Sequence, residues 1–216
     1  MKVLNVYGSS PTGSSAAIAN YFLEKVGRLG AEIQNINFIG KTIKSCKKCM
    51  SCKTTTDKCV IQDDMMTVFD SLMKCDVLIL YTGVYEGDVA ENMEIIESRL
   101  FSLLKPDYET NPHSSRLPPG KKLVFIQTQG ASKNRHTEIY GRFEVLFRKL
   151  EFSDIFIIHA DSIDDVLIIH ADYICKPYDF KERDDIMNLT DEIAEKIIHG
   201  CNTQQTNPPD PRSAGW

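Results

Sequence analysis

The chain lacks any long apolar run. None of its apolar stretches approaches the roughly 20 residues that a helix needs to cross a bilayer. The first ten residues, MKVLNVYGSS, also lack the apolar core and the small-residue cleavage site of a signal peptide. These absences predict a cytoplasmic protein that has no membrane partner.

An excess of basic residues is also missing. Lysine and arginine total 25 against 30 aspartates and glutamates, which gives a formal net charge of −5. Because binding to the phosphates of nucleic acid needs a basic surface, the composition argues against nucleic acid as a main partner.

Motifs of nucleophilic catalysis are absent as well. The sequence contains no G-x-S-x-G pattern, and its histidines are not spaced as a site. The aspartate pairs at 63–64, 164–165 and 184–185 fall at turns or helix starts, where capping explains them. We therefore predict no catalytic side chain.

The 216 residues suffice for one domain with a buried core, which we assign to residues 1–200. Residues 201–216, CNTQQTNPPDPRSAGW, are rich in polar residues and proline, which predicts a flexible tail. The segments 154–161 and 165–172, DIFIIHAD and DVLIIHAD, nearly repeat each other. This short repeat indicates a strand with an additional neighbouring strand rather than a repeat architecture.

Short apolar runs alternate with longer amphipathic segments along the chain. The pattern predicts strands over 2–7, 31–38, 76–83, 122–130 and 154–160, and helices over 14–30, 62–75, 91–104, 136–152 and 180–200. The strands are near-continuous apolar runs, as in a parallel sheet that is covered on both faces. The fold class is therefore α/β, with a three-layer, doubly wound parallel sheet. In such sheets ligands bind in the loops beyond the carboxyl ends of the strands.

The loop after the first strand is rich in hydroxyl groups. Residues 8–15, GSSPTGSS, hold four serines, one threonine and two glycines just before a helix. Hydroxyls and backbone N–H groups at a helix N-terminus bind phosphate. The loop has neither the G-x-G-x-x-G pattern nor a G-K-S/T ending, and it lacks lysine and arginine. It therefore suits a phosphate monoester of a tightly bound cofactor, and a plain polar turn with an N-cap is the alternative.

Two more strand-end loops are polar and contain glycine. Residues 82–90, TGVYEGDVA, follow the third strand, and residues 127–132, QTQGAS, follow the fourth. Glycine lets the backbone approach a flat ring, and Tyr85 would cover one face of that ring. Alternatively, Tyr85 is an ordinary half-buried tyrosine.

Four of the seven cysteines lie in the short segment SCKKCMSCKTTTDKC, residues 45–59. They form the pattern C-x2-C-x2-C-x6-C and are Cys46, Cys49, Cys52 and Cys59. Four thiolates match the ligand count of a [4Fe–4S] cluster. Structural zinc more often uses two C-x2-C pairs set further apart, and a redox pair would leave two cysteines unexplained. Cluster-free thiols are also an open interpretation.

Five lysines surround these cysteines: Lys44, Lys47, Lys48, Lys53 and Lys58. Their charge would offset the negative charge of a cluster, or it would keep a surface loop solvated. The other cysteines, Cys75, Cys175 and Cys201, are scattered and need no function.

These features together resemble the flavodoxin-like FMN proteins of the NAD(P)H-dependent FMN reductase superfamily, and within it the iron–sulfur flavoproteins. The resemblance covers residues 1–200. It rests on GSSPTGSS, on the cysteine segment that runs into CVIQDDM (59–65), and on TGVYEGDV (82–89). It implies a flavodoxin-like domain with a cysteine-rich loop, residues 45–60, after the second strand.

The resemblance also implies roles for the three strand-end loops. The first loop would hold the FMN phosphate, the second would lie along the ribityl chain and isoalloxazine ring, and the third would approach the ring. By position, the phosphate contacts are Ser9, Ser10, Thr12, Ser14 and Ser15. The second loop would supply Thr82, Gly83, Val84, Tyr85, Glu86 and Gly87, and the third Gln127, Thr128 and Gly130.

The sequence departs from the family pattern at several of these positions. The first loop has no arginine, Gly83 replaces a usual proline, and Glu86 replaces a usual aromatic residue. If Glu86 faces the ring, its carboxylate would disfavour the anionic reduced flavin and lower the reduction potential.

We therefore expect an FMN-dependent electron-transfer oxidoreductase with a [4Fe–4S] cluster on the cysteine loop. NAD(P)H is a candidate donor, and the redox partner is a small molecule or a protein. Because the cysteine loop extends from the body, a cluster there would reach a flavin across a subunit interface, so a homodimer or homotetramer is expected. One alternative is a cluster-free NAD(P)H-dependent FMN or quinone reductase. Another is a non-enzymatic flavodoxin-fold binding module with zinc or free thiols.

Overall fold

The computed structural model describes residues 1–7, 12–132, 134–161 and 183–199. Several expectations lie outside these residues. They concern Ser9, Ser10, Cys175, the second copy of the short repeat and the tail 201–216.

The described residues form one central sheet whose strands run parallel in the order β2–β1–β3–β5–β6. These strands are β1 (Lys2–Tyr7), β2 (Glu32–Asn37), β3 (Val77–Tyr85), β5 (Lys122–Gln129) and β6 (Asp154–Asp161). A short strand, β4 (Asp88–Val89), pairs antiparallel with the end of β3. Without this hairpin strand the order is 2-1-3-4-5, which is the flavodoxin-like arrangement.

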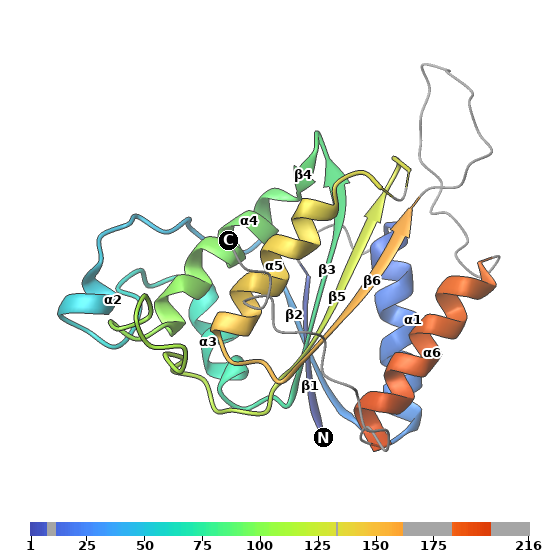
Figure 1. Cartoon of the computed structure of the whole chain (residues 1–216), viewed down its shortest axis with the longest axis horizontal. Coiled ribbons are helices and arrows are strands. Elements are labelled where there is room, and N and C mark those ends of the chain that lie inside the picture. The colour runs from blue at the N-terminus through green and yellow to red at the C-terminus, as the bar shows by residue number, and fades with distance from the viewer. Residues whose placement is uncertain (8–11, 133, 162–182, 200–216) are drawn as a thin grey trace, which may run out of the picture.

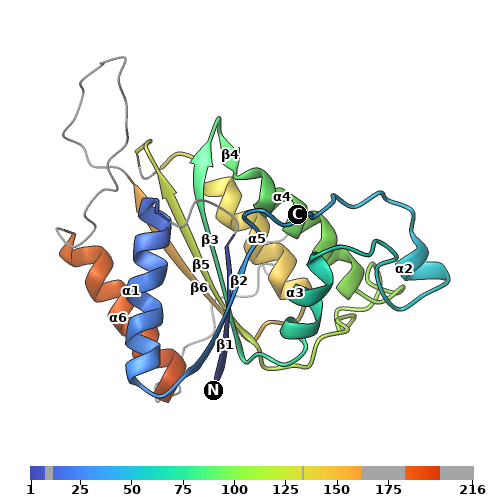
Figure 2. The same ribbon diagram turned by 180° about the vertical axis from the view of Figure 1, so that it is seen from behind.

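Helices cover both faces of the sheet (Figures 1 and 2). On one face lie α1 (Ser14–Arg28) and α6 (Asp184–His199). On the other lie α3 (Met65–Leu72), α4 (Glu91–Leu100) with the 3-10 turn η1 (Phe101–Leu103), and α5 (Thr137–Lys149). A one-turn helix, α2 (Ser51–Thr54), lies beyond α3 and α4 at one end of the molecule (Figures 1 and 2).

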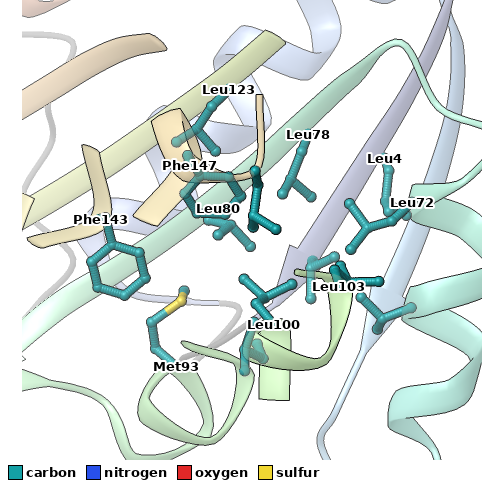
Figure 3. Close-up of a cluster of buried hydrophobic side chains, with 14 of the residues drawn as sticks. Leu4, Leu72, Leu78, Leu80, Met93, Leu100, Leu103, Leu123, Phe143 and Phe147 are labelled. Atoms are coloured by element: carbon teal, nitrogen blue, oxygen red, sulfur yellow. The ribbon is translucent and has the colours of Figure 1, made fainter. Parts of the chain in front are cut away.

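Each face of the sheet has its own apolar core. Leu80, Met93 and Phe143 belong to the cluster under α3, α4 and α5 (Figure 3). Phe22 and Ile79 belong to the cluster under α1 and α6. The central strand β3 is buried continuously from Val77 to Gly83, because both faces of a parallel sheet are covered. The predicted three-layer α/β fold is confirmed.

Two local features differ from the sequence-based expectation. The third helix begins at Met65 rather than at residue 62, and Asp64, at its N-cap position, makes no capping bond. Its side chain instead accepts a hydrogen bond from the backbone of Thr42. Asp63 accepts a bond from the N–H of Met65, but it also forms a buried ion pair with Arg99. Capping therefore does not explain Asp64, and it explains Asp63 only in part. They bind the segment that precedes the cysteines.

Among the residues that the structure describes, no helix is both long enough and apolar enough to span a membrane.

Candidate functional site

The carboxyl ends of β1 and β3 lie side by side at the centre of the sheet, with Tyr7 opposite Tyr81. From β1 the chain passes through α1 to β2 on one side, and from β3 it passes through α4 to β5 on the other. Connections that leave in opposite directions open a crevice beyond the strand ends, and flavodoxin-like sheets bind their ligand there. The strands that precede the three predicted loops, β1, β3 and β5, all end at this edge.

The described part of the first loop leads into α1 without a side-chain cap. Gly13 occupies the N-cap position and therefore supplies no side-chain capping bond. Ser14 and Ser15 are its first residues, and Ser15 is buried. The backbone N–H groups at this end of the 15-residue helix are of the kind that bind anions, and the N-cap residue is a glycine rather than a polar side chain. Thr12 lies just before it.

The second loop is a tight hairpin between β3 and β4. Val84 pairs with Val89, and Tyr85 pairs with Asp88. The two turn residues both have positive φ, 49° at Glu86 and 88° at Gly87, as in a type I′ turn. Glycine adopts this conformation readily, but glutamate does so at a cost in backbone energy.

Thr82 and Gly83 shape the base of this hairpin. The buried Thr82 hydroxyl donates to the carbonyl of Gly83 and accepts from the N–H of Ala90. A Cβ atom at position 83 would lie 3.1 Å from the hydroxyl oxygen of Tyr85 and 3.2 Å from two of its ring carbons. The Tyr85 ring therefore folds back over Gly83, in space that a larger residue would fill. Tyr85 is nevertheless 56% exposed, so it is not a half-buried tyrosine.

The third loop is built by two buried glutamines. Gln129 donates through Nε2 to the carbonyls of Ser132 and Arg135, at 2.8 and 2.9 Å. Gln127 donates to Oε1 of Gln129 and to the carbonyl of His136. The His136 ring lies beside Gly87, 3.8 Å from where a Cβ atom would stand, so the second and third loops meet. Thr128 and Gly130 lie along this same strand end.

Some buried polar atoms at this edge have no partner among the described residues. They include Oε1 of Gln127 and the hydroxyl oxygen of Tyr81. Both residues are fully buried, and burial raises the pKa of Tyr81. Because buried polar groups are normally hydrogen-bonded, such atoms fit a crevice that holds a polar ligand. The residues present therefore fit a phosphorylated cofactor such as FMN.

An ion-pair network fixes the hairpin against α4 and α5. Arg142 donates to Asp88 at 2.8 Å and to Glu97 at 2.9 Å. The hydrogen bond from Arg142 lowers the pKa of Asp88, whereas burial raises the pKa of Glu97. The pair with Asp88 is partly exposed, so it positions the hairpin more than it stabilises the fold.

The cysteine segment forms a second candidate site, away from the strand ends (Figures 1 and 2). Its four cysteines line one cavity of about 20 Å³, to which Ile61 and Arg99 also contribute. Cys52 is buried, Cys46 and Cys59 are half-buried and Cys49 is exposed. We call this cavity the cysteine pocket.

The backbone of the cysteine pocket bends sharply. Lys48 and Met50 have φ values of 53° and 57°, which are unusual for residues other than glycine. This bend directs the N–H of Lys48 to Sγ of Cys46, at 3.5 Å. Loops that point N–H groups inward make concave anion sites, including sites for iron–sulfur clusters. Hydrogen bonds from Ser51 lower the pKa of the Cys49 thiol.

A buried ion pair anchors both ends of the cysteine segment. Arg99 on α4 donates to Asp63 at 2.7 Å, and both side chains are almost fully buried. The same guanidinium donates to the carbonyls of Lys44 and Ile61, which flank the four cysteines. Arg99 thus connects the start and the end of the segment to one helix.

Two further cations anchor its middle. Lys53 is buried and donates to the carbonyls of Phe101 and Leu104, at 2.7 and 2.6 Å. Its ammonium lies 4.1 Å from the centre of the Phe101 ring. Arg116 donates to the carbonyl of Cys52 at 2.7 Å.

Sequence reasoning did not single out Arg99 or Arg116, and it treated Lys53 only as one of five lysines around the cysteines. One signal was present for Arg99, because it falls on the buried face of α4 together with Ile95, Ile96 and Leu100. A charged residue at such a position needs a buried partner, which Asp63 provides.

Within the described ranges, no three or more His, Cys, Asp or Glu side chains are grouped so that they would hold a metal ion. That geometry describes a single ion. In a [4Fe–4S] cluster each cysteine binds a different iron, so four thiols around a common cavity are the relevant arrangement. Four thiols around one cavity are the donor set that a [4Fe–4S] cluster requires, so the residues of the cysteine pocket fit such a group.

Comparisons of sequence place the chain near known flavoproteins. Residues 1–94 match the family of NADPH-dependent FMN reductases. An iron–sulfur flavoprotein of Methanocaldococcus jannaschii is 30% identical over 104 residues, which are 48% of this chain and 52% of the relative. One of Methanosarcina thermophila is 26% identical over 109 residues, 50% of this chain and 56% of the relative. The matches thus span about half the length of these curated relatives.

Solved structures share the fold. A flavone reductase superposes with a TM-score of 0.61 at 16% identity, over 94% of this chain and 66% of that chain. An FMN-dependent NADH-azoreductase of Bacillus anthracis, in complex with FMN, gives 0.60 at 15% identity, over 92% and 99% of the two chains. A flavodoxin of Streptococcus pneumoniae gives 0.52 at 14%, over 93% and 100%. At these identities the likeness shows the fold, which is flavodoxin-like.

These findings confirm the resemblance that the loops and the cysteines predict. The chain is similar to the NADPH-dependent FMN reductases over residues 1–94 and, at modest identity over about half of its length, to iron–sulfur flavoproteins.

Proposed function

We propose that this protein is an FMN-dependent electron-transfer oxidoreductase that also holds a [4Fe–4S] cluster in the cysteine pocket. The observation on which the proposal depends most is that all four cysteines of the C-x2-C-x2-C-x6-C segment line one cavity. FMN exchanges one or two electrons and a cluster exchanges one, so together they would convert paired transfers into single steps.

The FMN site is supported by the carboxyl edge of the sheet. Ser14 and Ser15 at the N-terminus of α1 would hold the phosphate, and the hairpin from Thr82 to Gly87 would lie along the flavin. The buried Oε1 of Gln127 is available to a donor on the ring, while the Nε2 of Gln127 is used within the protein. No side chain in this arrangement needs to act as an acid or base, and the residues bind, orient and shield the cofactor.

The cluster is supported by the chemistry of the cysteine pocket. The N–H of Lys48 already donates to Sγ of Cys46, and hydrogen bonds to sulfur stabilise a cluster of negative charge. The relatives named iron–sulfur flavoproteins point to the same cofactor.

The two sites lie apart within one chain. The cysteine segment around α2 is at one end of the molecule, beyond α3 and α4, whereas the hairpin lies at the strand-end edge (Figures 1 and 2). Electrons would therefore pass between the cluster of one subunit and the flavin of another, and we propose a homodimer or homotetramer. NAD(P)H or a small redox protein would supply or accept the electrons.

Anaerobic purification followed by absorption spectroscopy and by iron, sulfide and FMN analysis tests the proposal. We expect one FMN and four irons with four sulfides for each chain, and visible absorption that reductant bleaches. The variant Cys52→Ala should lose the iron but keep FMN. The matched control is Cys75→Ala, which removes another buried cysteine that does not line the pocket and should keep the iron.

Three results would contradict parts of the proposal. FMN without iron, together with NAD(P)H oxidation, would indicate the cluster-free reductase. A colourless protein with one zinc would indicate a non-enzymatic module and would reject both cofactors. If Cys75→Ala lost as much iron as Cys52→Ala, the cysteine pocket would be rejected as the cluster site.

A further inference from the structure

Two cationic side chains next to the cysteine pocket are buried, whereas the charged side chains of a surface loop are normally exposed. The Arg99 side chain is 0% exposed and lines the cavity itself. Lys53 is 9% exposed and directly follows Cys52, which lines the cavity. They reach the pocket from α4 and from α2, so the fold places two buried positive charges around one small space.

One hydrogen-bond donor of Arg99, its Nε–H, is not used in contacts among the described residues. Its two terminal nitrogens bind Asp63 and the carbonyls of Lys44 and Ile61. Its Nε is buried and has no hydrogen-bond partner in the part of the chain that the structure describes. A buried guanidinium N–H without an acceptor is costly, because it has lost water and gained nothing in return. Because Arg99 is one of the residues that line the cavity, an occupant of the cavity is the candidate acceptor for this N–H.

The charge on Lys53 is held in place by the protein. Two backbone carbonyls accept hydrogen bonds from the ammonium, and the faces of Phe101 and Tyr108 lie 4.1 and 5.6 Å from it. These groups favour the charged form and oppose the burial, which lowers the pKa of the Lys53 ammonium. The ammonium also interacts electrostatically with the thiols of Cys52 and Cys46. Only a small part of its field is screened, because the side chain is buried.

We propose that Arg99 and Lys53 set the reduction potential of the iron–sulfur cluster in the cysteine pocket, Arg99 through a hydrogen bond from Nε–H to a sulfur atom and Lys53 through its buried positive charge. This inference rests on the proposed function. A cluster gains one negative charge when it accepts an electron, so a fixed cation and a hydrogen bond to sulfur stabilise the reduced form. Both residues therefore raise the potential of the cluster.

The variant Lys53→Met tests the charge, because methionine keeps an unbranched apolar stem against Phe101. The matched control is Lys58→Met. Lys58 is also next to a pocket cysteine, Cys59, but it is exposed, so solvent and salt screen its charge. In a redox titration followed by absorption, Lys53→Met should lower the cluster potential by about 59 mV, which is tenfold in the ratio of oxidised to reduced cluster. This shift should persist at 1 M salt, whereas Lys58→Met should shift the potential little and lose that shift in salt.

The variant Arg99→Lys tests the hydrogen bond, and Asp63→Asn is its control. Both weaken the buried ion pair, but only Arg99→Lys removes the Nε–H. We expect a lower cluster potential and faster loss of iron to a chelator in Arg99→Lys than in Asp63→Asn. The FMN potential, measured in the same titration, should stay unchanged in all four variants.

The outcomes separate this inference from the proposed function. A wild-type protein with FMN but without iron and sulfide would overturn the cluster and the inference with it. A wild-type protein with iron and sulfide, whose cluster potential is the same in Lys53→Met and Lys58→Met, would overturn the role of Lys53 alone. Equal potentials and equal iron loss in Arg99→Lys and Asp63→Asn would overturn the role of Arg99.

Discussion

The strand-end edge and the cysteine pocket are built in different ways. At the strand-end edge the backbone supplies most of the geometry: an uncapped helix N-terminus, a type I′ hairpin and a glutamine-braced loop. Its ion pair, Arg142 with Asp88, is partly exposed. In the cysteine pocket, charged side chains supply the geometry. Arg99, Asp63 and Lys53 are buried there and connect a segment without regular structure, apart from one helical turn, to the body of the protein.

This difference shows which region the fold itself determines. The crevice at the strand ends follows from the order of the parallel strands, so any sequence with this topology has it. The cysteine pocket depends on a few long-range contacts, since Arg99 is 36 residues from Asp63 and 55 from Lys44. Single substitutions should therefore damage the cysteine pocket more than the strand-end edge.

The largest expected effect comes from breaking the buried ion pair. Asp63→Ala leaves the guanidinium of Arg99 buried without its counter-charge, and removal of one partner of such a pair costs about 3–5 kcal/mol. Urea denaturation of the apoprotein measures this cost as a lower free energy of unfolding. Limited proteolysis should also cleave residues 44–61 faster, because both ends of that segment are bound to Arg99.

The control is Asp88→Ala, which breaks the exposed pair with Arg142. This change should cost no more than about 1 kcal/mol. Equal losses in the two variants would contradict the distinction between a pocket that depends on buried charges and an edge that depends on its backbone.

The elements of the sheet could be predicted from the sequence because their signal is local. Parallel strands such as Val77–Tyr85 read as continuous apolar runs, and Gly30, with φ of 91°, marks the end of α1 as expected. The cysteine motif was equally visible, since its four thiols are close together in the chain. These signals predicted the fold class, which the structure confirms, and they indicated the two candidate sites.

The supporting contacts could not be predicted, because they join distant parts of the sequence. Nothing near Asp63 shows that its partner is Arg99 on α4, so helix capping was the simpler interpretation. The hairpin strand β4 was missed because Glu86–Gly87 is a weaker turn signal than Asn-Gly. Lys53 looked like its neighbours Lys47 and Lys58, and only the tertiary structure shows that it alone of these three is buried.

Acid should remove the contribution of the Asp63–Arg99 pair to stability. Burial alone would raise the pKa of Asp63, but hydrogen bonds from Arg99 and from the backbone of Lys44 outweigh it and lower that pKa. A carboxyl whose pKa is lowered on folding stabilises the protein above its unfolded pKa of about 3.9, and this contribution is lost as the pH falls through the folded pKa. The difference in unfolding free energy between the wild type and Asp63→Asn should therefore be largest near neutral pH and shrink below about pH 4. Urea denaturation across this range checks it, and a constant difference would contradict the assignment.

The smallest effects concern residues that hold the same strained backbone conformation in the two regions. Glu86 at the hairpin and Met50 in the cysteine pocket have φ values of 49° and 57°. Asparagine tolerates this conformation better, so Glu86→Asn and Met50→Asn should each raise the free energy of unfolding, by about 0.5–1 kcal/mol. Thermal denaturation of the apoproteins measures this gain.

The two variants should differ in the holoprotein, because only Glu86 brings a carboxylate near the proposed flavin. Removal of that negative charge favours the anionic reduced form, so Glu86→Asn should raise the FMN potential and Met50→Asn should leave it unchanged. An FMN potential that responds equally to both substitutions would mean that Glu86 does not face the flavin, and the hairpin would then act only through its backbone.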